Sequence, residues 1–213
     1  MSESIYPVPA HIKNAALVDN DKYNTMYKQS IDDPEGFWRE HGKRLDWSTP
    51  YNKVKNTSFD KGHISIRWYE DGQLNASYNC IDRHLATKAD KTALIWEGDN
   101  PEHSENISYQ QLHDEVAKLA NGLKKLGVSK GDRVAIYMPM TPQAIYAMQA
   151  CARIGAIHSV VFGGFSPSAI ADRINDSGAK VVITSDEGRR AGNCVPLKAN
   201  VDEAVSQDSV TTV

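Results

Sequence analysis

From about residue 90 onward, short apolar runs alternate with stretches whose apolar residues recur every three or four positions. The runs cover 92–98, 133–139, 157–162 and 180–185. The spacing between the runs matches one face of an amphipathic helix. Strands that alternate with such helices are typical of parallel βαβ units, and strands this apolar are usually buried on both faces. We therefore predict an α/β fold, with a doubly wound, mainly parallel sheet and helices on both faces.

The sequence also marks where these helices begin and end. Ser108, followed three residues later by Gln111, has the pattern of a capping box. The helix that it opens stops at Gly127, a residue type that commonly ends helices. The other two helices should each open at a hydroxyl residue followed by proline, over 141–154 and 166–178.

Residues 1 to about 85 have a different pattern, with many aromatic residues and few long apolar runs. Asp33 and Pro34 are typical of the cap and first residue of a helix, and residues 63–74 alternate as a strand that ends in a turn. The tryptophans could form a platform for a sugar or nucleotide, but without a polar cluster beside them packing is the better interpretation. We predict an irregular and helical N-terminal extension over 1–85, before an α/β domain over 86–213.

The C-terminal segment looks incomplete. After residue 185 come a charged loop, a helix predicted at 201–205 and the lead-in to another strand at 209–213. A parallel sheet that stops there lacks further crossovers and leaves an open edge, which favours aggregation. We therefore expect the chain to be part of a longer polypeptide, with the remainder of that polypeptide as its partner.

Charge and composition exclude several classes. The net charge is −3 with no clustered basic face, so nucleic acid is not an expected partner. No stretch approaches 18 apolar residues and no signal peptide is visible, so no membrane contact is expected. The three cysteines, Cys80, Cys151 and Cys194, are too scattered for a disulfide framework and indicate a reducing cytoplasm. Cys151 has the surroundings of a small core residue.

One candidate for chemistry is the double glycine at the end of the third apolar run. Gly163 and Gly164 precede a helix that should begin after Ser166. Ligands of open α/β sheets bind beyond the carboxyl ends of strands, and glycine lets backbone approach a phosphate. The sequence matches neither common glycine-rich phosphate-binding motif. A purely structural turn before a helix capped by Ser166 therefore explains the two glycines equally well.

A second candidate follows the next apolar run, where Arg189 and Arg190 stand in a glycine-containing loop. In a right-handed parallel arrangement this loop and the double glycine should lie at the same edge of the sheet. Arginine suits phosphate because its planar guanidinium donates two hydrogen bonds at once. A solvated charged loop is the alternative, but together the two loops favour an anionic ligand.

Other polar residues have simpler interpretations. The seven histidines are dispersed without metal-ligand spacing, so no metal site is predicted. His158 lies inside an apolar run and is interpreted as a core histidine. Asp82, Arg83 and His84 are interpreted as an ion-paired helix face. No catalytic residue can be assigned from the pattern.

Several blocks carry a resemblance to a known family. They are PYNKVKNTSF, IRWYEDGQLNASYNCIDRHL, ALIWEGD, ISYQQLHDEVAKLANGLKKLGVSKGDRVAIYMPM, ACARIGAIHSVVFGGFSPSAIADRI and VITSDEGRRAG. In this order they resemble the first third of bacterial AMP-forming acetyl-CoA synthetases (acetate–CoA ligases), members of the adenylate-forming superfamily. The resemblance covers nearly the whole chain. It implies that the α/β region is the first subdomain of the adenylate-forming fold.

The resemblance implies a reaction in two steps. Acetate attacks the α-phosphate of ATP, with magnesium assisting, and gives acetyl-adenylate and pyrophosphate. The thiol of coenzyme A then attacks the acyl carbon and releases AMP. A small C-terminal domain of such enzymes turns between the steps. The family's phosphate loop, adenine-binding segment, hinge and catalytic lysine are not among these residues, so we expect the chain by itself to be inactive.

The resemblance also implies where coenzyme A is bound. Gly164 matches a glycine against which the nucleotide end lies, and Phe162 matches an aromatic residue beside it. Arg190, Ala191 and Gly192 match the start of a coenzyme A-binding R-A-G-R stretch, whose fourth position is Asn193 here.

Arg189 stands where the family commonly has an apolar residue, and it is a candidate to compensate for the arginine missing at Asn193. Two other classes of function stay open. They are a naturally short, non-catalytic module that binds coenzyme A or docks to a full-length synthetase, and a structural module without a ligand.

Overall fold

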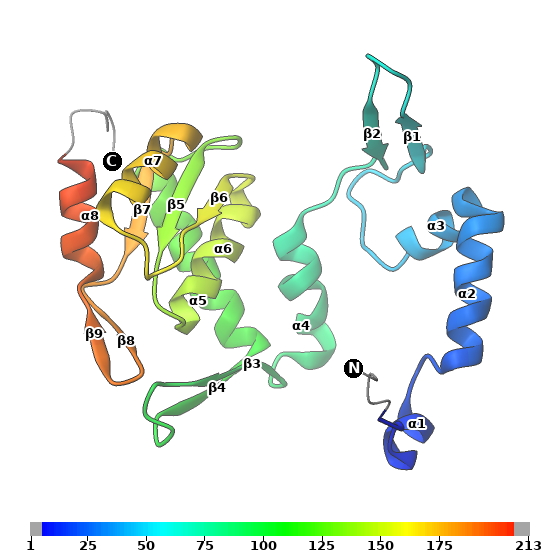
Figure 1. Ribbon diagram of the computed structural model, residues 1–213, viewed down its shortest axis with the longest axis horizontal. Coiled ribbons are helices and arrows are strands. Elements are labelled where there is room, and N and C mark those ends of the chain that lie inside the picture. The colour runs from blue at the N-terminus through cyan, green and yellow to red at the C-terminus, as the bar shows by residue number, and fades with distance from the viewer. Residues whose placement is uncertain (1–5, 207–213) are drawn as a thin grey trace, which may run out of the picture. The chain divides into compact units, whose positions relative to one another are not determined.

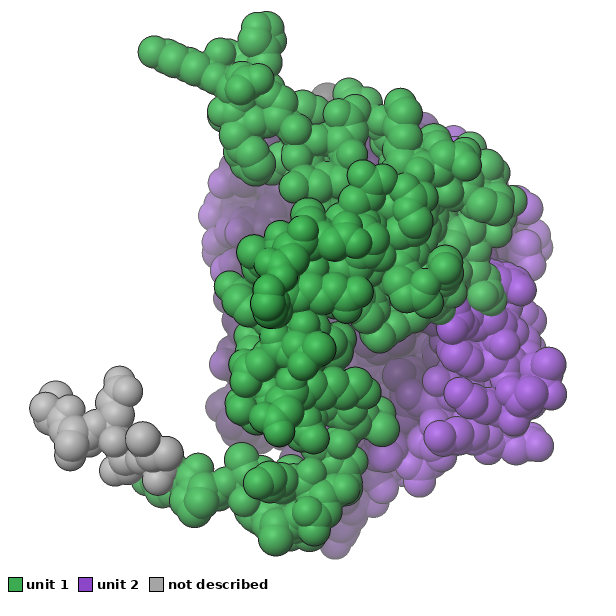
Figure 2. All heavy atoms as spheres, turned by 90° about the vertical axis from the view of Figure 1, so that its right-hand side faces the viewer, with its two compact units in different colours: residues 1–73 green, residues 74–213 purple. Residues whose placement is uncertain are grey.

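The computed structural model describes residues 6–206, and the chain divides into two compact units, Met1–Gln73 and Leu74–Val213. Figure 2 colours the two units separately. The strand expected at 209–213 lies outside the described residues. No helix within residues 6–206 is both long enough and apolar enough to span a membrane.

The described part of the first unit consists of helices followed by a two-stranded antiparallel sheet. Its elements are α1 (Ala10–Ala15), α2 (Asn20–Asp32), α3 (Pro34–Gly42), β1 (Lys55–Ser58) and β2 (Ser65–Trp68). The prediction at the start of α3 is confirmed, since the Asp33 carboxylate accepts a hydrogen bond from the Gly36 N–H at 2.9 Å. The strand expected within 63–74 forms as β2, and it pairs antiparallel with β1.

The aromatic residues of this unit pack against one another, as the packing interpretation requires. The Tyr51 and Tyr69 rings lie 4.6 Å apart, and Trp47 lies 4.8 Å and 5.4 Å from them. Trp38 contacts Trp68 at 5.8 Å, edge to face. Such pairs contribute about 0.5–1.5 kcal/mol each beyond the burial of their area. These contacts join α3, the segment between α3 and β1, and the end of β2.

The second unit begins with elements that lie outside the parallel sheet. They are the π-helix η1 (Tyr78–Asp82), α4 (Arg83–Lys88), β3 (Thr92–Glu97), β4 (Ser104–Ser108) and α5 (Tyr109–Lys125). The expectation that 92–98 belongs to the parallel set was wrong, because β3 pairs antiparallel with β4. Only a short loop joins the two strands, and a parallel pair would need a crossover of a dozen or more residues.

The start of α5 follows the predicted capping box. The Ser108 hydroxyl accepts a hydrogen bond from the Gln111 N–H at 3.2 Å, and the Gln111 amide oxygen accepts one from the Ser108 N–H at 2.8 Å. These two bonds satisfy donors that the first turn of a helix leaves without intrahelical partners.

A parallel sheet forms the centre of the second unit (Figure 1). Its described strands are β5 (Arg133–Tyr137), β6 (Ile157–Val160) and β7 (Val181–Thr184), in the order β6-β5-β7, and β5 pairs parallel with both neighbours. The helices α6 (Pro142–Ile154) and α7 (Pro167–Ser177) connect these strands. A small antiparallel hairpin, β8 (Gly188–Arg190) and β9 (Asn193–Val195), leads to α8 (Leu197–Val205).

The two faces of β5 are buried in separate hydrophobic clusters, because successive strand residues point to opposite sides. Val134 and Ile136 pack with buried residues of α5 and α6, while Ala135 and Tyr137 pack with buried residues of α7 and α8. The central strand is therefore buried on both faces, as its apolar run predicts. Cys151 in α6 is fully buried, which confirms its interpretation as a core residue.

The neighbouring strand β6 differs. Ile157 and Val160 are 55% and 56% exposed, and His158 is also exposed. The interpretation of His158 as a core histidine was therefore wrong. An apolar run shows that a strand suits a buried sheet, but burial also requires layers over both faces. In the described residues β6 lies at the edge of the sheet.

Candidate functional site

The loop that follows β6 contains the double glycine and is tightly closed. The Phe165 N–H donates to the Phe162 carbonyl oxygen at 3.0 Å across the two glycines. The Tyr137 hydroxyl, at the end of β5, lies 3.0 Å from the Gly163 carbonyl oxygen and 3.1 Å from that of Phe165. The Asn200 side-chain N–H of α8 donates to the same hydroxyl at 3.2 Å. The loop is thus fixed to the sheet and to α8.

The two glycines of this loop are not equivalent. Neither has a positive φ, so backbone conformation does not require glycine at either position. A Cβ atom on Gly163 would meet its nearest neighbour, Leu197 Cδ2, at an ordinary 3.6 Å. A Cβ atom on Gly164 would lie 2.8 Å from Cε1 of Phe162, which is closer than carbon atoms can approach. Gly164 therefore allows the Phe162 ring to lie against the loop.

The hairpin β8–β9 brings Arg190 to this ring. The guanidinium carbon of Arg190 lies 5.2 Å from the centre of the Phe162 ring, within the range of a cation–π contact. Both side chains are exposed. The expectation that the two loops lie at the same edge of the sheet is therefore confirmed. The two loops share this edge because β6, β5 and β7 are parallel, so that their carboxyl ends lie together.

The turn of this hairpin consists of Ala191 and Gly192, which have φ angles of 49° and 77°. Two-residue hairpin loops with positive φ at both positions match the twist of the flanking strands. Glycine takes such angles freely, whereas for alanine they cost about 1–2 kcal/mol. Ala191 is therefore a strained residue that other contacts must hold in place.

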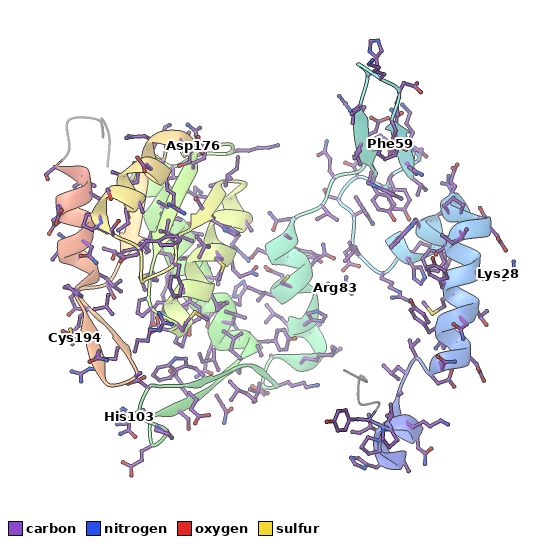
Figure 3. The ribbon with its side chains drawn as sticks, viewed as in Figure 1. Lys28, Phe59, Arg83, His103, Asp176 and Cys194 are labelled. Carbon is purple, nitrogen blue, oxygen red and sulfur yellow. The ribbon has the colours of Figure 1, made fainter. Side chains whose placement is uncertain are left out.

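A carboxylate from a distant loop provides such contacts. Asp99, between β3 and β4, accepts hydrogen bonds from the Ala191 N–H at 2.9 Å and from the Gly192 N–H at 2.8 Å. In Figure 3, Cys194 and His103 mark the two hairpins that these bonds join. Sequence reasoning gave Asp99 no role, although it is the last residue of the matching block ALIWEGD, because its partner Ala191 lies 92 residues away.

The strand register fixes which side chains share a face of the hairpin. Arg190 pairs directly with Asn193, so these two side chains lie on one face, whereas Arg189 pairs with Cys194 on the opposite face. Arg189 lies 3.6 Å from the Glu187 carboxylate. A hydrogen bond to the same carboxylate raises the pKa of the Cys194 thiol. Arg189 therefore does not share the face on which Arg190 contacts Phe162.

The base of the hairpin is packed closely. A Cβ atom on Gly188 would meet Leu197 Cδ1 and Pro139 Cβ, each at 3.1 Å. The Lys198 N–H donates to the Asp186 carbonyl oxygen at 3.1 Å. The hairpin is thus anchored at its base by packing and at its tip by Asp99.

Another group of charges, away from this loop, has a structural role. Both oxygens of Asp82 accept hydrogen bonds from Arg153 in α6, at 2.7 Å and 2.6 Å. Burial raises the pKa of Asp82, but Arg153 outweighs this effect and holds the pKa below its usual range. The expected ion pairing is thus confirmed for Asp82.

No group of three or more His, Cys, Asp or Glu side chains that could hold a metal ion occurs within residues 6–206.

Comparison with known proteins gives a consistent result along the chain. Residues 23–80 match the family described as acetyl-coenzyme A synthetase N-terminus, and residues 81–213 match the AMP-binding enzyme family. The acetyl-coenzyme A synthetase of Pseudoalteromonas translucida (strain TAC 125) is 84% identical over all 213 residues. The enzyme of the same name from Vibrio cholerae is 62% identical over 214 aligned residues.

This chain covers 33% of the length of each of these two relatives. It therefore spans about one third of the curated proteins that it matches. The family match covers more than half of the chain and includes the sheet, the double-glycine loop and the hairpin. The chain belongs to the AMP-binding enzyme family.

Proposed function

We propose that the chain is the N-terminal part of an AMP-forming acetate–CoA ligase and contributes part of its coenzyme A site. The whole enzyme would convert acetate, ATP and coenzyme A to acetyl-CoA, AMP and pyrophosphate through acetyl-adenylate. Support comes from relatives named acetyl-coenzyme A synthetase that align with the entire chain. The sheet would be the first part of a doubly wound adenylate-forming domain over 86–213, preceded by an extension over 1–85.

The observation that carries the coenzyme A assignment is the contact between Arg190 and Phe162. The guanidinium rests on the ring at 5.2 Å, and no carboxylate within residues 6–206 forms an ion pair with it. A guanidinium that is exposed, oriented and not neutralised is suited to donate to phosphate oxygens. Coenzyme A carries a 3′-phosphate and a diphosphate. Phe162, Gly164 and the residues Arg190–Asn193 would line its nucleotide end.

The remaining components lie elsewhere in the proposed enzyme. ATP, the magnesium ion that accompanies it, and acetate would be bound by the remainder of the polypeptide, which would contain the family's phosphate loop and adenine-binding segment. No residue of this chain is assigned a catalytic role, and by itself the chain would make no acetyl-adenylate. The reaction would take place in the cytoplasm, without nucleic acid or membrane.

The test uses a hybrid protein in which this chain replaces the matching third of the Pseudoalteromonas translucida relative. Arg190→Ala should raise the KM for coenzyme A about tenfold or more, since a hydrogen bond to a charged group contributes about 1.5–3 kcal/mol. Acetate-dependent pyrophosphate exchange, which does not require coenzyme A, should persist.

Arg189→Ala is the matched control and should have a smaller effect, because this side chain lies on the opposite face of the hairpin. An unchanged KM for coenzyme A in Arg190→Ala would contradict the proposed site. A hybrid that forms no acetyl-CoA with its original residues in place would contradict the proposed activity.

A further inference from the structure

We propose that Asp99 is a positioning residue for coenzyme A binding, which holds the Ala191–Gly192 turn and thereby keeps Arg190 on Phe162. The proposal rests on the proposed function, because it assumes that Arg190 faces the phosphates of coenzyme A. Among the described residues, the Asp99 side chain bonds to the backbone of Ala191 and Gly192 and forms no hydrogen bond or ion pair with the side chain of Arg190. Its effect passes through the backbone of the turn that follows Arg190.

The backbone N–H groups of the turn bind the Asp99 carboxylate. Successive backbone N–H groups in a turn can form a small concavity that binds anions. Each oxygen of the Asp99 carboxylate accepts from one of these groups, at 2.9 Å and 2.8 Å. The two bonds are charge-assisted and parallel, which makes them stronger and more directional than neutral ones.

Ala191 is strained in this turn. A φ of 49° is unfavourable for alanine, so without a partner for its N–H the turn is free to relax to another conformation. Arg190 is the residue immediately before this position. A change of the turn would therefore change the direction of its side chain. The exposed contact with Phe162 is too weak to hold the hairpin tip alone.

The loop that carries Asp99 is held by its own backbone hydrogen bonds. The Gly98 N–H donates to the His103 carbonyl oxygen at 2.7 Å, and the His103 N–H donates to that of Asn100 at 2.9 Å. The Trp96 indole N–H of β3 donates to the Met140 carbonyl oxygen at 2.8 Å. Pro139, the residue before Met140, lies near the hairpin base, since a Cβ atom on Gly188 would be 3.1 Å from Pro139 Cβ. The segment that follows β5 therefore lies at the hairpin base and also bonds to β3, the strand before the loop that holds the hairpin tip.

The experiment uses the hybrid protein described above. Asp99→Ala should raise the KM for coenzyme A about tenfold, while acetate-dependent pyrophosphate exchange stays within about twofold of the parent. Asp99→Asn should have an intermediate effect, because its single amide oxygen can replace only one of the two acceptors. Glu102→Ala is the matched control, since it removes an exposed carboxylate from the same loop and should leave both measurements unchanged.

A double variant distinguishes positioning from a general loss of stability. Glycine takes a positive φ without strain, so Ala191→Gly should make the turn less dependent on Asp99. In the Asp99→Ala background it should recover most of the affinity for coenzyme A. Amide exchange gives a readout independent of activity. In Asp99→Ala the N–H groups of Ala191 and Gly192 should exchange faster, and in Glu102→Ala they should not.

Each outcome bears on the proposal. A KM for coenzyme A that Asp99→Ala leaves within twofold of the parent, while Arg190→Ala raises it, would overturn the role of Asp99 and leave the proposed function intact. Loss of pyrophosphate exchange together with coenzyme A binding, without rescue by Ala191→Gly, would show a structural role only and also overturn it. An unchanged KM in Arg190→Ala would instead remove the proposed site on which Asp99 acts.

Discussion

The ring of Phe162 lies so close to Gly164 that a Cβ atom at position 164 would approach Phe162 Cε1 to 2.8 Å. The same ring supports the guanidinium of Arg190. The smallest residue of one loop and the cation of another are therefore linked through a single aromatic side chain. The conformation of Phe162 depends on what stands at position 164, and the position of Arg190 depends on Phe162.

This relationship predicts the effect of Gly164→Ala in the hybrid protein. The added methyl group should displace the Phe162 ring and remove a cation–π contact worth about 0.5–1 kcal/mol at an exposed site. The KM for coenzyme A should therefore rise about two- to fivefold. Gly163→Ala is the comparison, because its Cβ would meet only an ordinary contact at 3.6 Å. Equal effects of the two variants would contradict the role given to Gly164.

A second prediction concerns Asn193, the cross-strand neighbour of Arg190. Asn193→Arg would place a second guanidinium on the same face of the hairpin and add charge-assisted donors for phosphate. The KM for coenzyme A should fall about three- to tenfold, and its dependence on salt should become steeper. Steady-state kinetics at two ionic strengths would measure both effects. The same substitution at Cys194, on the opposite face, should give no comparable gain, and an equal gain there would contradict the assignment of faces.

A third prediction concerns stability and pH. The buried Asp132 carboxylate lies 2.7 Å from the Lys180 ammonium group and accepts hydrogen bonds from the Ser129 N–H and hydroxyl at 2.9 Å and 2.8 Å. Lys180 and then Ser129 hold the pKa of Asp132 far below its usual range. The charged form is thus favoured in the folded state. Its contribution is fully present above the unfolded pKa of about 3.9 and is lost as the pH falls towards the folded pKa.

Asp132→Asn should therefore lower the thermal midpoint of this chain at pH 7, by about 2–5 °C. The difference between variant and parent should shrink as the pH is lowered below about 4. Thermal unfolding at several pH values would measure it. Asp202→Asn serves as the control, because its ion pair with Lys198 on the surface of α8 is more than half exposed and should contribute little. A difference that stays constant down to pH 3 would contradict the pKa assignment.

Several elements of this fold could be read from the sequence because their causes are local. The capping box at Ser108 depends on two side chains three residues apart, and the helix start at Pro34 depends on its neighbour Asp33. The apolar run of β5 predicts a strand buried on both faces, and the alternating residues of that strand do pack in two clusters. The double-glycine loop and the arginine loop lie at a common edge because the strands before them are parallel and their carboxyl ends lie together.

Other features were decided only by the tertiary structure. The antiparallel pairing of β3 depends on its partner β4, and the exposure of His158 depends on which layers cover β6. Gly164 leaves room for the Phe162 ring at its present position, although its own backbone conformation does not call for glycine. Asp99 reaches Ala191 across 92 residues. Sequence patterns record preferences over a few neighbouring positions, whereas these contacts join segments that only the packed chain brings together.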